Sequence, residues 1–361
     1  MHFGVELDDE RLLALYRPDD RIKTVLTADV YGQGQADSLL GRALAGLPRD
    51  SYCLVGAVGH DFYGGEREGA KGFPRFTDPG LRDPGDYASY LRMATERSLE
   101  RIGVDSFDLL LLHNPDRTGY SSESVWNGMR ALRDDGLAQL LGVAPGPANG
   151  FTLDLIDCLE RFGEAIDWAM VILNPMEPWP GELVLPAAER HDVKLITRVV
   201  DYGGLFHDDI RPGHKFPRFD HRSFRPQGWV EEGRSKLERL RPIAARHGLT
   251  MLQLACEWNL GHAPVQCVVP TLIQEPGDDA KPVEAKREEL ASLPEPNPLT
   301  AEDFAEIRAI GDNTNCMALK GASPDYEGEE LPDRWPLDDH LVEVAVRWDI
   351  HPGEQLVQTH S

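Results

Sequence analysis

Short runs of β-branched residues and leucine alternate with longer amphipathic stretches along most of this chain. This alternation is typical of βα units with parallel strands, because each helix carries the chain back across the sheet. The strand-like runs are bounded by turn residues and fall at 3–7, 24–28, 52–58, 107–113, 139–144, 169–173, 193–198 and 265–270. The pattern therefore predicts a parallel sheet covered by helices.

The stretches between these runs have helical periodicity. Apolar residues recur every three or four positions most plainly over 87–102. Thr300 followed by Asp303 predicts a capped start for a late helix that ends at Gly311. Further helices are predicted at 38–47, 123–133, 153–162, 183–190, 235–246 and 251–260.

Eight strands, each followed by a helix over about 300 residues, favour a closed (β/α)8 TIM barrel over an open doubly wound sheet. The open dinucleotide-binding sheet needs G-x-G-x-x-G directly after a strand, and Gly32 with Gly34 lacks the third glycine. We predict a single barrel domain over 1–312 and a C-terminal extension over 313–361 that packs on the barrel or trails from it.

Two connecting segments, 60–85 and 202–233, are long and rich in glycine, proline and aromatic residues. In a barrel both would follow the C-terminal ends of strands, where substrates bind. Long loops at such places often cover a site. We therefore expect them to be lids over the mouth of the barrel.

Composition narrows the class of partner. The chain has 37 Lys plus Arg against 61 Asp plus Glu, a formal net charge of −24, which argues against nucleic-acid and membrane-surface partners. Five cysteines without a C-x-x-C pair favour a reducing compartment. Neither a secretory signal nor an apolar run of about 18 residues is present. We expect a cytoplasmic protein with a small-molecule substrate, and the oligomeric state stays open.

Three motifs resemble the aldo-keto reductase superfamily: T-A-D-V-Y-G at 27–32, F-D-L-L-L-L-H-N-P-D at 107–116 and D-G-L-A-Q-L-L-G-V at 135–143. Their order and spacing match as well, and the resemblance covers most of 24–290. It implies a (β/α)8 barrel in which NADP or NAD lies across the mouth and serves the reduction or oxidation of a small polar carbonyl or sugar-like compound.

The resemblance also implies site residues. The family's proton-donating tyrosine maps to Tyr31, and its substrate-orienting histidine maps to His113. The family's aspartate and lysine, which lower the pKa of the tyrosine, are replaced by Leu26 and Ala57. Without the ammonium the tyrosine returns toward a pKa of about 10, and proton donation weakens by roughly 10² or more. Losing both partners together leaves no unpaired buried charge.

Other polar residues at the predicted mouth are candidates for supporting roles. Asp29 is a candidate catalytic group, with a structural hydrogen-bond acceptor as the alternative. His60 and Arg198 are candidates for a replacement positive charge. The candidate substrate-binding residues are His60, Arg198, Asp201, His207 and Trp229. The alternatives are an Arg198 to Asp201 ion pair and an ordinary solvated loop.

The cofactor signature differs from the family pattern. Ala144 and Pro145 stand where the family has a Ser-Asn pair, and they lack side-chain hydrogen-bonding groups. The candidate cofactor-binding residues are Asn174, Thr271 and Lys286. NADP or NAD is the cofactor that the resemblance implies, and no cofactor is the alternative. No metal is predicted, because His207, Asp208, Asp209 and His221 match no ligand spacing.

Two further functions stay open at this stage. A non-redox lyase, dehydratase or isomerase could use Tyr31 and His113 for acid and base chemistry on the same barrel. A catalytically silent binding subunit is the third possibility, because a fold does not fix a function.

Overall fold

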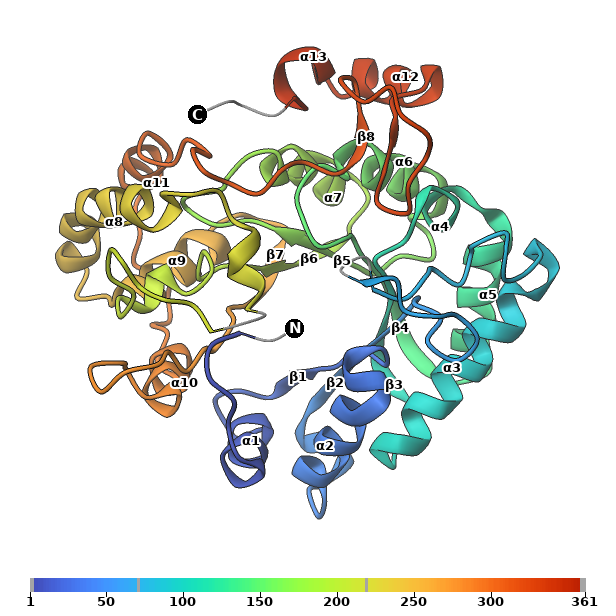
Figure 1. Ribbon diagram of the computed structural model, residues 1–361, viewed down its shortest axis with the longest axis horizontal. Coiled ribbons are helices and arrows are strands. Elements are labelled where there is room, and N and C mark those ends of the chain that lie inside the picture. Colours follow the sequence, from blue (N-terminus) through green and yellow to red (C-terminus); the bar gives the residue numbers. More distant parts are fainter. Residues whose placement is uncertain (1–2, 70–71, 218–219, 358–361) are drawn as a thin grey trace.

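The computed structural model describes residues 3–69, 72–217 and 220–357. Its main sheet is parallel, and its strands follow one another in chain order. The sheet curls, and helices surround its outer face (Figure 1). Its strands are β1 Thr24–Leu26, β2 Cys53–Val58, β3 Phe107–His113, β4 Ala138–Ala144, β5 Trp168–Ile172, β6 Lys194–Arg198 and β7 Val265–Val269.

The helices form where the periodicity predicts them, and further ones form besides. The capped start at Thr300 is confirmed, with a reciprocal capping box to Asp303. The helices are α1 Asp9–Tyr16, α2 Gln35–Leu44, α3 Tyr87–Ile102, α4 Arg117–Ser121, α5 Glu123–Asp134, α6 Thr152–Phe162, α7 Leu185–Arg190, α8 Trp229–Arg246, α9 Met251–Leu260, α10 Val283–Ala291, α11 Ala301–Arg308, α12 Asp339–Arg347 and α13 Pro352–Gln355.

The strand expected at 3–7 is wrong for the residues that the structure describes there. Gly4 has a positive φ of 61°, which is incompatible with a strand. A Cβ at this position would lie 2.2 Å from the carbonyl oxygen of Gln274. Instead of forming a ladder, the segment makes a bond from the backbone N–H of Val5 to Gln274 O at 2.9 Å, just beyond β7.

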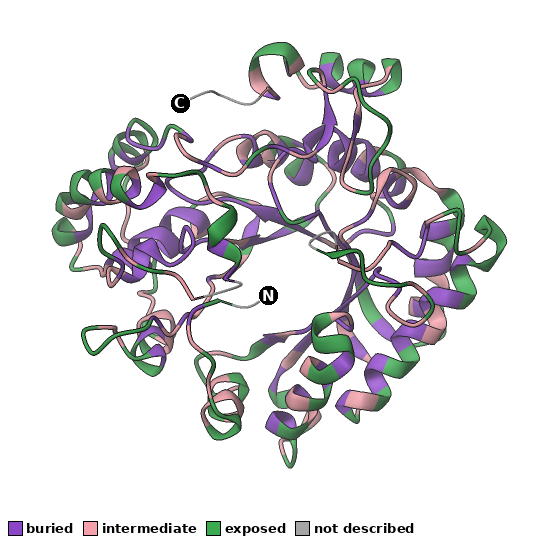
Figure 2. Ribbon diagram, viewed as in Figure 1, coloured by how far each residue is buried: buried purple, intermediate pink, exposed green. Residues whose placement is uncertain are grey.

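The strands separate two apolar clusters, because alternate side chains point to opposite faces. The larger cluster joins the sheet to the helices and includes Leu54 and Leu110. The smaller cluster contains strand residues of the other parity, and Ala57 belongs to it while Leu26 packs against it. This second cluster fills the inside of the curled sheet, whose strands are largely buried (Figure 2). Leu26 and Ala57 therefore face the interior.

The segment after residue 312 packs along α6. It forms a small parallel pair, β8 Gly321–Ser323 with β9 Arg334–Pro336. The indole N–H of Trp335 donates to one Asp154 carboxylate oxygen at 2.9 Å, and the N–H of Ala322 donates to the other at 3.2 Å. A single buried carboxylate thus ties both short strands to α6.

Replacing Asp154 by Ala should loosen this segment. Two buried donors would lose their acceptor, and each unsatisfied group costs about 1–3 kcal/mol. We expect a loss of about 2–4 kcal/mol in the free energy of unfolding, together with faster proteolysis beyond residue 312, measured by urea titration and limited digestion. Asp154→Asn retains one acceptor and should lose less. An Ala variant as stable and as protected as the wild type would contradict this assignment.

Candidate active site

Tyr31 and His113 lie together at the C-terminal edge of the sheet. Tyr31 follows β1 and begins a short 3-10 turn, Tyr31–Gly34, while His113 is the last residue of β3. The ring centroids are 5.7 Å apart, and the planes are perpendicular. Tyr31 is 51% exposed, so a ligand can reach it, whereas His113 is buried. The two residues that the resemblance singles out are thus neighbours at the face where barrel enzymes carry their sites.

The turn after Tyr31 depends on glycine. Gly32, Gln33 and Gly34 all have positive φ. A Cβ on Gly34 would lie 2.6 Å from Nε of Arg101. This tight turn lets the chain leave β1 and enter α2 directly, which fixes Tyr31 at the rim.

His60 extends the pair on the far side of His113. The two imidazole centroids are 5.1 Å apart. His60 Nδ1 lies 3.0 Å from the carbonyl oxygen of Phe73 and 3.1 Å from Nη1 of Arg75, and its Nε2 lies 3.1 Å from Nδ2 of Asn114. Both ring nitrogens are therefore held by the loop after β2 and by the residue that follows β3.

Both histidines are neutral around pH 7. Burial, followed by the positive charge of Arg75, lowers the pKa of His60 to about 3. Burial likewise lowers the pKa of His113 far below its ordinary value, and His60, Arg75 and Arg198 add to the effect. His60 therefore does not supply the replacement positive charge that the sequence left open.

Arg198 supplies positive charge at this edge of the sheet. Its Nη2 donates to the carbonyl oxygens of Pro145, at 3.0 Å, and Gly146, so the side chain reaches from β6 to the loop after β4. Arg198 opposes the rise in the pKa of Tyr31, but desolvation has the larger effect. Although half of the residue's surface is open, the phenol lies among enough protein atoms for its pKa to exceed the ordinary value of 10.

The depressed pKa values of the two histidines predict acid lability. Between the ordinary histidine pKa, near 6.5, and about 3 for His60, the unfolded chain binds protons that the folded chain does not. Stability should therefore fall as the pH falls below about 6.5, by up to about 1.4 kcal/mol per pH unit for each such histidine.

Urea unfolding between pH 7 and pH 4 measures this slope. His60→Asn should flatten it, whereas a control substitution at the exposed His351 should leave it unchanged. The comparison of variants is needed because burial raises the pKa of Asp154 to about 6, and this group acts in the opposite direction. Equal slopes for wild type and His60→Asn would contradict the prediction.

Asp29 is not brought to this pair. Its neighbours Ala28 and Val30 take the interior positions, so the carboxylate points toward the helices. Burial raises its pKa, and the charged groups that act on it are Asp37, Arg101 and Asp61. Asp29 therefore lies buried behind the sheet, and neither of its carboxylate oxygens has a hydrogen-bond partner among the described residues.

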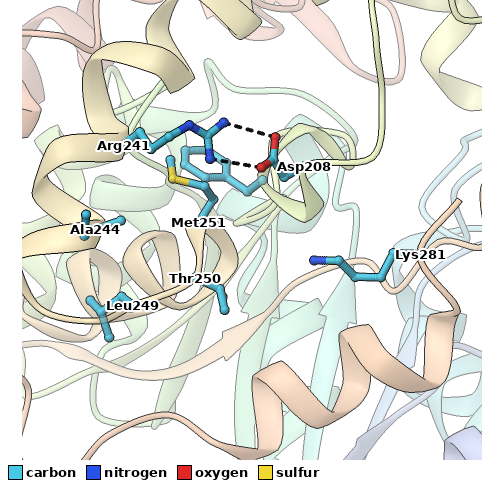
Figure 3. A pocket seen from close by; sticks show the side chains of 9 residues that line it. Asp208, Arg241, Ala244, Leu249, Thr250, Met251 and Lys281 are labelled. Atoms are coloured by element: carbon cyan, nitrogen blue, oxygen red, sulfur yellow. Dashed lines mark hydrogen bonds and ion pairs between the residues drawn. The ribbon is translucent and has the colours of Figure 1, made fainter. Parts of the chain in front are cut away.

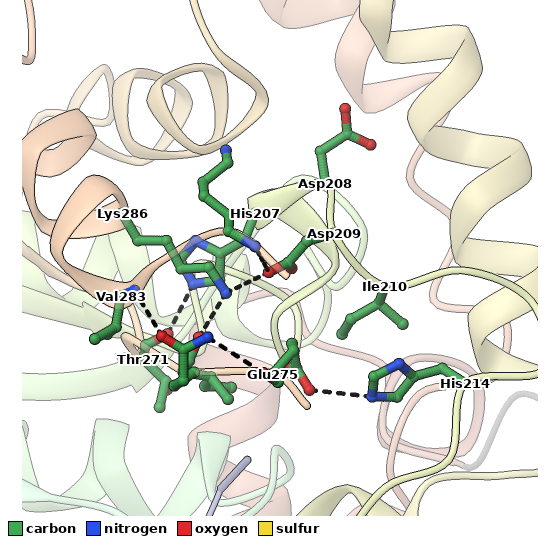
Figure 4. Close-up of polar contacts among 12 residues, drawn as sticks. His207, Asp208, Asp209, Ile210, His214, Thr271, Glu275, Val283 and Lys286 are labelled. Carbon is green, nitrogen blue, oxygen red and sulfur yellow. Dashed lines mark hydrogen bonds and ion pairs between the residues drawn. The ribbon is translucent and has the colours of Figure 1, made fainter. Parts of the chain in front are cut away.

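Asp201, His207 and Thr271 form a second polar group in the loops after β6 and β7. Figure 4 shows His207 and Thr271. An Asp201 carboxylate oxygen accepts from the N–H of Thr271 at 2.7 Å, and the carbonyl oxygen of Thr271 lies 2.8 Å from Nε2 of His207. These bonds join the loop after β6 to the loop after β7. The Arg198 to Asp201 ion pair, one of the alternatives, does not form.

Two of the residues predicted to bind a cofactor are fully engaged within the protein. The Asn174 amide donates to Glu177 and to the carbonyl of Val199, and its oxygen accepts from two backbone N–H groups. Lys286 is buried, and its Nζ lies 2.7 Å from an Asp209 carboxylate oxygen. Figure 4 shows the two side chains facing each other. In this conformation neither side chain fits the role of a cofactor ligand, because no polar group is left to face one.

Trp229 packs inside the second long loop. Its ring stacks on Phe216 at 5.6 Å, meets Tyr202 edge to face at 6.0 Å and lies 5.0 Å from the guanidinium of Arg225. The residue is 4% exposed. Its aromatic surface is thus used by the loop, and a direct contact with substrate has no support in this arrangement.

The acidic residues of the same loop are used in ion pairs. Asp208 binds Arg234 and Arg241, and Asp209 binds Lys286. Figure 3 shows Asp208 and Arg241 at a separate pocket of about 290 Å³ between α8, α9 and this loop. Within the described ranges, no group of three or more His, Cys, Asp or Glu side chains is placed to hold a metal ion.

Sequence reasoning missed Arg75 and Asn114. Arg75 comes from the first long loop, forms an isolated antiparallel bridge with His60 and donates through Nε to the carbonyl oxygen of Asn114. The loop itself was expected at the mouth. The sequence does not show which residue of this loop turns inward, because that depends on the path of the loop. For Asn114 the one available signal was its position directly after His113.

Comparison with known proteins shows which family this chain belongs to. The family model described as "Aldo/keto reductase family" matches residues 14–312, and the chain belongs to that family. The (β/α)8 fold class is thereby confirmed. A glycerol dehydrogenase from Gluconobacter oxydans superimposes with a TM-score of 0.65 at 22% identity, over 85% of this chain and 87% of that one.

Relatives of known sequence have differing names. A D-threo-aldose 1-dehydrogenase of a Pseudomonas species is 25% identical over 84% of this chain and 89% of its own. A probable voltage-gated potassium channel subunit beta of Arabidopsis thaliana is 24% identical over 76% of this chain and 81% of its own. In the part of the chain that the structure describes, every helix is too short or too polar to cross a membrane.

Proposed function

We propose that this protein is an aldo-keto-reductase-type oxidoreductase that acts on a small polar carbonyl compound or a sugar-like alcohol. The observation that carries the proposal is the perpendicular Tyr31 and His113 pair at the open edge of the sheet, with Arg198 nearby. Family membership and the dehydrogenase names of relatives support the same class of reaction.

Each residue of the group has a role in this proposal. Tyr31 holds the proton that goes to the carbonyl oxygen, since it is the half-exposed tyrosine at the rim beside His113. His113 is neutral and therefore orients the substrate by hydrogen bonding, without a competing charge. Arg198 favours the phenolate that forms when the proton leaves.

We propose that Leu26 and Ala57 make this site slow. Both belong to the apolar interior below Tyr31, where the family's aspartate and lysine would lie. The raised pKa of Tyr31 agrees with the loss of an ammonium from this place. A weak acid in the donor position lowers the rate of proton transfer.

NADP or NAD is the cofactor that we propose, and family membership supports it. The solved structure of an aldo/keto reductase of Klebsiella pneumoniae in complex with NADP supports it as well. That structure superimposes with a TM-score of 0.56 at 19% identity, over 86% of this chain and 89% of that one. Because Asn174 and Lys286 are engaged within the protein, we do not assign them to holding the nucleotide. The binding residues would be others, or these loops would have to rearrange.

That poor fit favours a second candidate function. A lyase, dehydratase or isomerase would need only the acid and base groups of the mouth, and those groups are present without a free cofactor ligand at Asn174 or Lys286. In this case Tyr31 and His113 would move a proton between carbon and oxygen of a carbonyl compound.

Tryptophan fluorescence under titration with NADPH and NADH, followed by assay of nucleotide oxidation with a panel of small polar aldehydes and ketones, tests the first proposal. We expect quenching below millimolar nucleotide and slow, carbonyl-dependent oxidation. No binding of either nucleotide at millimolar concentration would overturn it. Turnover without nucleotide, with solvent deuterium entering the substrate carbon, would establish the second candidate instead.

A further inference from the structure

The mouth contains two arginines that make no ion pair within the described residues. Arg75 is 6% exposed, and its bonds go to the carbonyl oxygen of Asn114 and to His60. Arg198 is partly buried, and its bonds go to the carbonyl oxygens of Pro145 and Gly146. All of these partners are neutral groups.

This arrangement departs from the rule that the rest of the chain follows. The other buried basic residues all face carboxylates: Arg222 binds Asp220 and Glu275, Lys236 binds Asp312, and Lys286 binds Asp209. Leaving a buried charge unpaired costs several kcal/mol, so such charges are ordinarily paired. Two guanidiniums beside one site, neither in contact with a carboxylate, therefore indicate an anion that binds from outside.

The carboxylates around Arg75 are used elsewhere. Asp116 accepts from the hydroxyl of Thr77 at 2.6 Å and from the N–H of Gly119 at 2.8 Å. Asp333 pairs with Lys320. Both act on Arg75 at a distance and make no hydrogen bond to it, whereas its direct contacts are with Asn114 and His60.

The two charges lie close to His113. Arg75 donates to the carbonyl oxygen of Asn114, the residue after His113, and the N–H of Asn114 donates to the carbonyl oxygen of Ala144 at 2.7 Å. Arg198 donates to the carbonyl oxygen of Pro145, the residue after Ala144. In agreement with this placement, both arginines depress the pKa of His113. The chain as a whole carries a formal charge of −24 and repels anions. A local positive potential in such a protein concentrates an anionic ligand where the positive charges lie.

We propose that the substrate carries a carboxylate next to its carbonyl, as a 2-oxo acid or an oxidised sugar acid does, and that Arg75 and Arg198 bind this carboxylate. The inference rests on the proposed carbonyl chemistry for the identity of the reacting group. Guanidinium groups suit this task because their paired N–H groups match the two oxygens of a carboxylate. The carbonyl would then lie at Tyr31 and His113.

Binding of matched ligands tests the proposal without turnover. The probes are pyruvate and 2-oxobutyrate, each against its neutral methyl ester, measured by calorimetry on the full chain with and without NADPH. We expect each acid to bind at least about tenfold more tightly than its ester, which corresponds to about 1.4 kcal/mol. Added salt should weaken the binding of the acid and leave the binding of the ester unchanged. Equal affinity of acid and ester would overturn the proposal.

Two variants locate the preference. Arg198→Gln keeps a donor for the Pro145 and Gly146 carbonyls but removes the charge, and we expect the acid preference to fall at least threefold. Arg75→Lys keeps the charge without the paired N–H groups. We expect this variant to fold and to lose part of the preference for the acid. Arg241→Gln, at the separate pocket, is the matched control and should retain it. If both mouth variants keep the full preference for the acid over its ester, Arg75 and Arg198 do not bind the carboxylate.

The readouts separate this inference from the proposed function. Tight binding of acids without nucleotide oxidation would leave the anion site standing and remove the reductase assignment. Oxidation of nucleotide with neutral esters, without binding of acids, would support the reductase assignment and remove the anion site.

Discussion

Replacing Tyr31 by Phe should lower turnover by about 10²–10⁴ while leaving stability unchanged. The loss has this size because a positioned proton donor contributes about that factor. Stability should hold because Tyr31 is 51% exposed and its ring contact with His113 survives in Phe. The measurement is nucleotide oxidation with the best carbonyl of the panel, alongside urea unfolding.

Tyr326→Phe is the matched control for this variant. Its hydroxyl donates to the carbonyl of Glu329 in the C-terminal segment, at a place unconnected with the mouth. Its turnover should equal that of the wild type. A Tyr31→Phe variant that keeps wild-type turnover would remove Tyr31 from the mechanism, whatever the overall activity.

Introducing an ion pair at positions 26 and 57 should lower the pKa of Tyr31 and raise turnover. The double variant Leu26→Asp with Ala57→Lys places an ammonium beside the phenol, and an adjacent cation lowers a pKa by about one to three units. Turnover should rise with it. Ala57→Lys alone should lose about 3–5 kcal/mol of stability, since it buries an unpaired charge in an apolar cluster.

Ultraviolet titration of tyrosinate measures the pKa, with the Tyr31→Phe background subtracted. Ala57→Met is the control for added volume without charge. The double variant should be more stable than the single lysine variant, because the aspartate pairs with the ammonium. A double variant with an unchanged Tyr31 pKa would show that these positions do not adjoin the phenol in the way we propose.

Much of the fold could be predicted from the sequence, because periodicity and turn residues are local signals. Strand ends followed directly from the pattern, and Tyr31 and His113 are close because each stands at the end of a strand in one parallel sheet. The strand at 3–7 was wrong because a contact distant in the sequence decides this segment: Gly4 has a positive φ and lies close to the backbone of Gln274.

Side-chain partners across loops could not be predicted in this way. Lys286 was a candidate cofactor-binding residue in the sequence, but it is buried against Asp209, which comes from a loop far away in the chain. Arg75 showed no signal beyond its place in a long loop. In both cases the deciding contact joins segments whose relative path no local pattern records.

Transfer of label from NADPH deuterated at C4 of the nicotinamide tests the central claim most directly. The protein is incubated with this nucleotide and a carbonyl substrate in ordinary water, and the alcohol is examined by mass spectrometry and NMR. We predict one deuterium at the former carbonyl carbon in the wild type and a product yield at least about 10² lower in Tyr31→Phe. Product that carries no label, or that forms equally well without the nucleotide, would contradict the account.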